Sequence, residues 1–307
     1  MLLGLLLNPA VIGLTALFLA IVWMLRDETD RTRPLLVMAL VLNLVYGWVL
    51  SYVMGKENGL VPWKYDYVLL RLDDSLGEHA AAVAGFLQHS ARVPLFILYQ
   101  LMVPMMIVWF FVARSHRLSS AIVLAYIAEM VVGPLLYAVV PGCGPLYAFH
   151  ARWLQPPAVN PVAIRLSGMP NAFPSLHLAT ALVFVLFAPT RITRAIALTF
   201  LAGTALATIS TGEHYIIDLV AGLAFGCFAS AAGRKRLVSS LLFAGLALAW
   251  SLSVRFAGGF LIAHPAALRS FAAITVGAVA AAVALEWKSM QPANQPAEAA
   301  ATQLAQP

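Results

Sequence analysis

The sequence predicts an all-α fold, a polytopic transmembrane helical bundle of about nine spans. Of its 307 residues, 62% are hydrophobic and 10% are charged, whereas a soluble protein carries about 25% charged residues. The apolar residues fall in blocks of roughly 20, the length that a helix needs to cross the hydrocarbon core of a bilayer. Short clusters of Lys and Arg separate these blocks. A soluble multi-domain protein is therefore excluded.

The apolar blocks set the predicted spans, which are residues 2–25, 34–54, 93–113, 119–140, 174–190, 195–210, 214–232, 237–256 and 265–286. We expect the first span to be retained. No positive residue precedes its apolar run and the charges follow it, in the reverse order to a secretory signal. The tail from Pro292 is rich in Ala, Gln and Pro, and we expect it to be disordered.

Basic residues predict the orientation. They occur in the loops after the odd-numbered spans: Arg26, Arg31, Arg33, Arg114, Arg117, Arg191, Arg194, Arg234, Lys235 and Arg236. By the positive-inside rule these loops face the cytoplasm, so the N-terminus lies outside and the C-terminal tail inside. The net charge of +6 is scattered in these clusters. It forms no continuous basic face, which argues against a nucleic-acid partner.

Two long connections, 55–92 and 141–173, lie on the opposite side. The first contains the amphipathic segment "WKYDYVLLRLDDSLGEHAAAVAGFLQH", which we expect to lie on the membrane surface. The second is rich in Pro and Gly and predicts irregular backbone that caps the bundle.

The stretch "STGEHYIIDLVAG" places His214 and Asp218 four residues apart at the start of a span. Residues at this spacing share a helical face. A carboxylate there can fix the tautomer of an imidazole and make the ring a nucleophile or a general base. A purely structural hydrogen bond is the alternative. Glu213, just before the helix, favours the helix dipole.

A second histidine follows a helix start in "NAFPSLHLATALVF". Pro174 suits the first turn of a helix, and Ser175, Leu176 and His177 are predicted to occupy the same turn. Their backbone N–H groups then form an anion site suited to phosphate. The predicted topology brings His177 and His214 to the same outer membrane face. A histidine at an interface is more often a simple anchor, so this convergence carries the argument.

Other readings remain. Two histidines and an aspartate supply three metal ligands with one open position, but no H-E-x-x-H motif supports a metal site. A transporter or channel could use His and Asp as a proton relay, although the chain lacks the internal repeats typical of transporters. A non-catalytic lipid-binding protein would not need His177, His214 and Asp218. Cys143 and Cys227 indicate no disulfide framework.

The two histidine motifs together resemble the phosphatidic acid phosphatase type 2 (PAP2) superfamily. "FPSLHLA", with Leu176 in place of a more usual Gly, and "GPLYAF" at 144–149 are similar to the branch of inositol phosphorylceramide synthases and related inositolphosphotransferases. The resemblance covers a six-helix core, residues 34–232. It leaves an extra span and cytoplasmic loop at 1–33, two extra spans at 233–290 and the tail at 291–307.

The resemblance implies roles for the site residues. His214 attacks phosphorus and forms a phosphohistidine, Asp218 orients it, and His177 protonates the leaving oxygen and then activates the acceptor. No metal or other cofactor is implied. The substrate is a membrane lipid phosphate, and the reaction is head-group transfer to a lipid hydroxyl or hydrolysis. The branch favours transfer. The sequence carries no signal for an oligomeric state.

The phosphate-binding cation is the main departure from the superfamily. Thr208 stands where the superfamily has an Arg six residues before the second histidine. Charge on a transferring phosphoryl group needs compensation. The cation candidates, in order, are Arg165, Lys64, Arg71 and Arg152.

We expect an integral membrane protein, most simply of a bacterial inner membrane with the site facing the periplasm or exterior. A secretory-pathway membrane with a lumenal site would satisfy the same physics. The lipid bilayer itself is the expected partner.

Overall fold

The computed structural model describes residues 61–77, 80–116 and 118–290. The predicted spans 2–25 and 34–54, with their cytoplasmic loop, and the tail from 291 lie outside the described residues. The elements, in chain order, are β1 (Trp63–Lys64), α4 (Asp66–Leu76), α5 (Ala80–Ser90), α6 (Arg92–Gln100), α7 (Met102–Ser115), α8 (Ser119–Val139), α9 (Pro145–Phe149), η1 (His150–Arg152), β2 (Ile164–Arg165), α10 (Leu176–Leu186), α11 (Arg191–Thr211), α12 (Ile216–Gly233), α13 (Leu237–Ala263) and α14 (Pro265–Ser289).

Five of these helices, α8, α11, α12, α13 and α14, are long and apolar enough to cross a membrane. The consecutive helices α6 and α7 would form one more span that is bent by 52°. The predicted all-α membrane bundle is thereby confirmed for the described part of the chain.

The bend divides the predicted span 93–113. Helix α6 ends at Gln100 and α7 begins at Met102. Pro104 explains the break, because a proline has no N–H to donate to the carbonyl four residues earlier, at Gln100, and its ring crowds that carbonyl.

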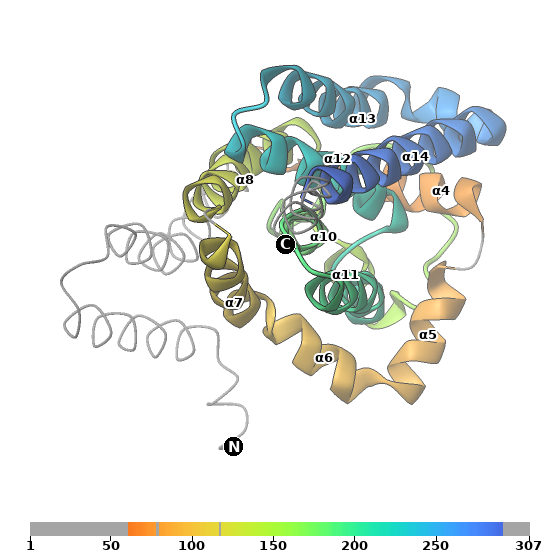
Figure 1. The fold of residues 1–307 in the computed structure, drawn as a ribbon. Helices are drawn as coiled ribbons and strands as arrows, with labels where there is room; N and C mark the ends of the chain where they lie inside the picture. Colours follow the sequence, from red (N-terminus) through yellow and green to blue (C-terminus); the bar gives the residue numbers. More distant parts are fainter. Residues whose placement is uncertain (1–60, 78–79, 117, 291–307) are drawn as a thin grey trace, which may run out of the picture.

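Helix α10 lies at the centre of the bundle, beside α8, α11 and α12 (Figure 1). All its residues from Leu178 to Leu186 are buried. It is shorter than the predicted span 174–190, because a helix enclosed by other helices need not match the thickness of a bilayer. The outer helix α13 instead runs past its predicted end at 256 to Ala263.

Two glycines let α12 pack tightly on α10. A Cβ atom on Gly222 would lie 2.5 Å from the carbonyl oxygen of Ser175, and one on Gly226 would lie 2.6 Å from that of Ala179. Their G-x-x-x-G spacing is typical of close helix pairs in membranes. The pairing sets the start of α12 against the start of α10.

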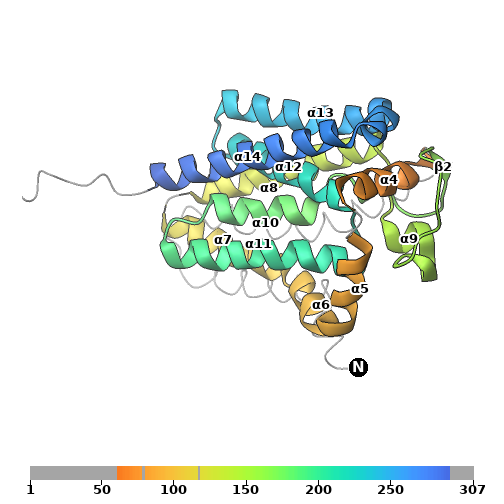
Figure 2. The ribbon, with the colours of Figure 1, turned by 90° about the vertical axis from the view of Figure 1, so that its right-hand side faces the viewer.

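One end of the bundle is covered by α4, α9 and the β1–β2 pair (Figure 2). In that pair Trp63 lies opposite Arg165. Helix α4 packs on α13 and α14, and its Leu69 and Leu72 are fully buried. This segment was expected to lie on the membrane surface, and in the structure the apolar side chains of α4 fill the end of the bundle. The connection 141–173 is largely irregular, as predicted.

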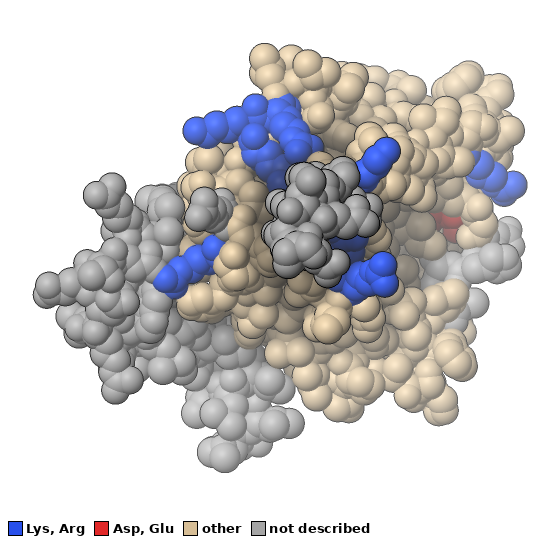
Figure 3. All heavy atoms as spheres, viewed as in Figure 1, with Lys and Arg blue, Asp and Glu red and all other residues tan. Residues whose placement is uncertain are grey.

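The opposite end is basic. Figure 3 views the molecule from this end, where Lys and Arg side chains gather. They come from the end of α7, the start of α11, the α12–α13 turn and the end of α14: Arg114, Arg191, Arg194, Arg234, Lys235, Arg236 and Lys288. Glu286 pairs with Arg234 and Arg236. The basic clusters of the described loops thus share one end of the bundle.

Candidate functional site

The two predicted histidines meet at the covered end of the bundle. His214 lies in the turn between α11 and α12, and His177 lies in the first turn of α10. Their ring centroids are 5.9 Å apart and the ring planes make an angle of 66°. The structure therefore brings together two side chains that are 37 positions apart in the sequence.

The ring of His214 is fixed by a backbone carbonyl. Its Nδ1 lies 2.8 Å from the carbonyl oxygen of Ala172. A carbonyl oxygen only accepts hydrogen bonds, so Nδ1 carries the proton and Nε2 carries the lone pair. The side chain is 95% buried, and burial lowers the pKa of His214 from 6.5 to about 4. At neutral pH the ring is an uncharged base with one nitrogen available as a nucleophile.

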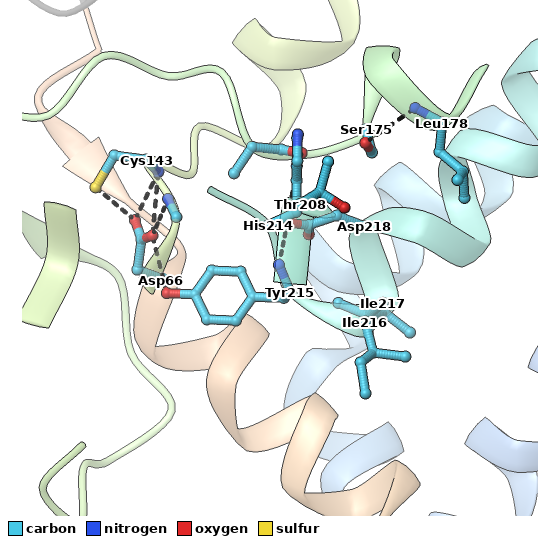
Figure 4. Close-up of polar contacts among 12 residues, drawn as sticks. Asp66, Cys143, Ser175, Leu178, Thr208, His214, Tyr215, Ile216, Ile217 and Asp218 are labelled. Atoms are coloured by element: carbon cyan, nitrogen blue, oxygen red, sulfur yellow. Dashed lines mark hydrogen bonds and ion pairs between the residues drawn. The ribbon is translucent and has the colours of Figure 1, made fainter. Parts of the chain in front are cut away.

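Asp218 is close to this ring, with Oδ2 3.6 Å from Nδ1 of His214. Figure 4 shows the two side chains beside Tyr215. His214 lies outside the helix, because α12 begins at Ile216 and Tyr215 is its N-cap. Oδ2 of Asp218 accepts a hydrogen bond of 2.7 Å from the backbone N–H of Tyr215. We expected His214 and Asp218 to share a helical face. In the structure Asp218 caps the start of α12 beside the His214 ring, and the ring itself is hydrogen-bonded to the carbonyl oxygen of Ala172.

The start of α10 also differs from the prediction. Ser175 is the N-cap rather than a residue of the first turn, and its Oγ accepts from the N–H of Leu178 at 3.4 Å. Its own N–H donates to the carbonyl oxygen of Asp218 at 3.0 Å. Ser175 therefore ties α10 to α12 and has no N–H left for an anion.

Two backbone donors at the start of α10 remain for a ligand. Within the described part of the chain, no acceptor bonds the backbone N–H of Leu176 or of His177. The positive end of a helix dipole points at the same place. This helix start suits a phosphate oxygen.

Three of the four side chains predicted to bind the phosphate as cations have partners other than the two histidines. Lys64 is fully buried and donates to the carbonyl oxygen of Val61 at 2.7 Å. Arg71 pairs with Asp74 at 2.9 Å, and the guanidinium of Arg165 lies 5.1 Å from the ring centre of Trp63. Arg152 is exposed in η1. Among the described residues, no hydrogen bond or ring contact joins the guanidinium of any of these three arginines to either histidine.

Two carboxylates of α4 were not predicted. Asp66 accepts from the N–H groups of Cys143 and Gly144 and from the Tyr215 hydroxyl. Asp73 accepts from the N–H groups at the start of α12. Burial raises the pKa of both groups. Their spacing of seven residues, two helical turns in an apolar chain, was a signal that could have drawn attention to them.

An open pocket reaches His214, and Asp73 and Asp74 are part of its wall. Pro145, Trp153 and Ile209 are among the side chains that give it a mostly apolar lining. Such a lining suits the part of a lipid next to its phosphate.

Metal-ligating side chains do not cluster in the described residues: no three of His, Cys, Asp or Glu are grouped as a metal ion would require. The arrangement offers a neutral imidazole with a lone pair, a carboxylate beside it, a second imidazole and an anion-binding helix start.

Comparison with known proteins identifies the family of the chain. The sequence profile of the PAP2 superfamily matches residues 68–232, more than half of the chain. The matched range lies within the predicted core, 34–232, and contains His177, His214 and Asp218. No curated protein and no solved structure gives a significant match. The chain belongs to the PAP2 superfamily, a group of membrane phosphatases and phosphotransferases that act on lipid phosphates.

Proposed function

We propose that the protein is an integral-membrane enzyme that acts on a lipid-linked phosphate through a phosphohistidine on His214. The observation that carries the proposal is the histidine pair. One ring has its tautomer set by Ala172, and the second ring lies 5.9 Å away at the start of a helix that offers backbone donors.

In the first step Nε2 of His214 attacks phosphorus, and the bond from phosphorus to the leaving oxygen breaks. His177 donates a proton to that oxygen, so the leaving group departs as an alcohol. The N–H groups of Leu176 and His177 bind the phosphoryl oxygens. The ring of His214 gains positive charge, which the carboxylate of Asp218 stabilises at 3.6 Å.

In the second step an acceptor hydroxyl attacks the phosphohistidine. His177 takes the proton from the acceptor, a new phosphorus–oxygen bond forms, and the phosphorus–nitrogen bond breaks. With water as the acceptor the protein is a phosphatase; with a lipid hydroxyl it is a head-group transferase. We favour transfer from a phosphoester lipid, because "FPSLHLA" and "GPLYAF" resemble the inositol phosphorylceramide synthase-like branch.

We keep Arg165 as the first cation candidate for the phosphate. Its guanidinium stacks on Trp63, whereas that of Arg71 is neutralised by Asp74. If Arg165 binds the substrate, Arg165→Ala raises KM, and Arg71→Ala is its matched control.

We also propose a catalytic core at 34–232, with additional spans at both ends. The site faces the periplasm or exterior of a bacterial inner membrane. The basic end of the bundle, opposite the site, supports this orientation by the positive-inside rule.

The test uses the purified full chain in lipid vesicles with a panel of phospholipids and polyprenyl phosphates. Each donor is labelled at phosphorus and, separately, in the head group. We expect label on the protein, lost in His214→Ala, with turnover reduced on the order of 10³-fold or more. Label on the protein from both positions shows that the head group stays attached to the phosphorus of the phosphohistidine. Recovery of that label in a new lipid indicates transfer, and its release into water indicates hydrolysis.

His89→Ala is the matched control, because His89 is an exposed histidine of α5. A His214→Ala variant as active as this control would contradict the mechanism, as would a wild-type protein that neither releases nor transfers phosphate. Treatment with a chelator is expected to leave turnover unchanged. Collapse of activity, restored by zinc, would favour the metal alternative.

A further inference from the structure

Helix α4 carries two buried carboxylates across the site end of the bundle. Asp66 is fully buried and Asp73 is 4% exposed. The sequence drew attention to the basic residues of this segment, Lys64 and Arg71. Two acidic residues of α4 hydrogen-bond to residues just after His214, and Figure 4 shows one of them, Asp66, with the Tyr215 hydroxyl.

Asp73 holds the start of α12. Its two oxygens accept from the backbone N–H of Ile216 at 2.7 Å and of Ile217 at 2.9 Å. A carboxylate stabilises the positive end of a helix dipole, and here it comes from a different helix. The first residues after the His214–Tyr215 dipeptide are thereby tied to α4.

Asp66 holds the other side of the same turn. It accepts from the N–H of Gly144 at 2.9 Å and from the Tyr215 hydroxyl at 3.0 Å. The 143–146 loop in turn packs on the turn that carries His214. The N–H of Leu146 donates to the carbonyl of Gly212 at 2.9 Å, and a Cβ on Gly144 would collide with the carbonyl of Glu213. The loop, α4 and the histidine turn therefore form one connected unit.

Holding α4 in place does not require buried carboxylates. Apolar side chains of similar volume stabilise such an interface as well or better, because burying a charge carries a large desolvation penalty. Both carboxylates accept hydrogen bonds from residues that lie within three positions of His214 in the chain. We propose that Asp66 and Asp73 are positioning residues of the phosphoryl transfer. They act through Tyr215, Ile216 and Ile217 to keep Nε2 of His214 in line with the bound phosphorus. This inference rests on the proposed function.

Two variants test the proposal. Tyr215→Phe removes the hydroxyl that Asp66 binds and keeps the ring, and Asp73→Asn removes one acceptor from the start of α12. A displacement of about 1 Å can reduce a rate a hundredfold. We expect each variant to lower kcat, and the rate of phosphohistidine formation with it, by about tenfold or more. KM should change by less than about threefold, because substrate binding does not depend on the nucleophile.

Glu286→Gln is the control for loss of stability. Glu286 is also a buried carboxylate and pairs with Arg234 and Arg236 at the opposite end of the bundle. We expect it to lower the unfolding temperature and to leave kcat per folded protein unchanged.

The proposal is overturned if Tyr215→Phe and Asp73→Asn lower kcat per folded protein no more than Glu286→Gln does. It is also overturned if they raise KM at unchanged kcat, which would make Asp73 a substrate-binding residue. Either result leaves the proposed function standing, provided that wild type forms a phosphohistidine and His214→Ala does not. If the wild-type protein forms no labelled phosphohistidine, the proposed function itself is wrong.

Discussion

At the scale of single residues, the orientation of His177 depends on ring contacts. Its ring stacks on Tyr99 of α6, with centroids 4.4 Å apart and planes inclined by 28°. Tyr99 lies two residues before the bend at Leu101. The bent span thus supplies one face of the surroundings of the proposed acid.

Removing the ring of Tyr99 should therefore impair leaving-group protonation. We expect Tyr99→Ala to lower kcat by about tenfold for a lipid substrate with an alkoxide leaving group, since misorientation forfeits part of general acid catalysis. Steady-state turnover in vesicles measures this. Tyr99→Phe keeps the stacking and should stay close to wild type. If the two variants were equally impaired, the hydroxyl rather than the ring would matter.

The low pKa of His214 predicts the acid limb of the reaction. Asp218, Glu213 and the His177 ring lie around it. Protonation of Nε2 removes the nucleophile, and burial brings that protonation down from pH 6.5 to about 4. With a p-nitrophenyl phosphoester, whose departure needs no acid, kcat/KM should stay flat from pH 7 to about 5 and fall below that. A limb centred near pH 6.5 would show that the ring is solvated.

The sequence was informative about side chains and silent about backbone partners. His177, His214 and Asp218 were predicted because ionisable groups stand out in an apolar chain. Ala172 was missed, because any residue can offer its carbonyl oxygen. Asp66 and Asp73 were missed because the segment that carries them was expected to lie at the surface.

At the scale of elements, the contact between α10 and α12 sets the distance between the two histidines. The helices approach so closely that side-chain atoms on Gly222 or Gly226 would meet the backbone of α10. The close packing of α10 on α12 therefore contributes to the geometry of the site.

Gly226→Ala should destabilise the protein by about 1–3 kcal/mol, because the added methyl group overpacks the interface. Gly245→Ala on α13 is the matched control, since nothing lies within 4 Å of a Cβ there. It should be neutral or stabilising by up to about 1 kcal/mol. Unfolding temperatures in detergent measure both. Equal effects of the two substitutions would contradict the close packing.

Helix limits followed from the sequence for some helices and not for others. Helix α8 ends within one residue of its predicted limit at 140. Helix α10 is much shorter than predicted, because hydropathy records apolar surroundings without distinguishing lipid from protein. Pro104 indicated a disturbance of the helix near Met102. It did not predict a break, because a proline within a span is also compatible with a continuous kinked helix.

At the scale of the whole molecule, the polar asymmetry of the bundle predicts its orientation. The site end carries the capping segments and the other end carries the Lys and Arg clusters. Charge alternation along the sequence was sufficient to predict this separation, because consecutive helices run in opposite directions.

An impermeant thiol reagent tests the orientation. Asn160 and Ser115 are exposed at the two ends, and both native cysteines are buried. In intact cells Asn160→Cys should be labelled and Ser115→Cys should not, while lysis should expose both. The reverse pattern would place the site in the cytoplasm, and the unsubstituted protein gives the background.

Two helices begin side by side at the site, and each start is a place where an anion could settle. Asp73 already fills the start of α12, so an entering phosphate finds only the start of α10 open. The carboxylate of Asp73 occupies the N–H groups at the start of α12, so a phosphate cannot bind there. The fold thus excludes one wrong location for the substrate before any cation takes part, and the place left open is the one beside His177.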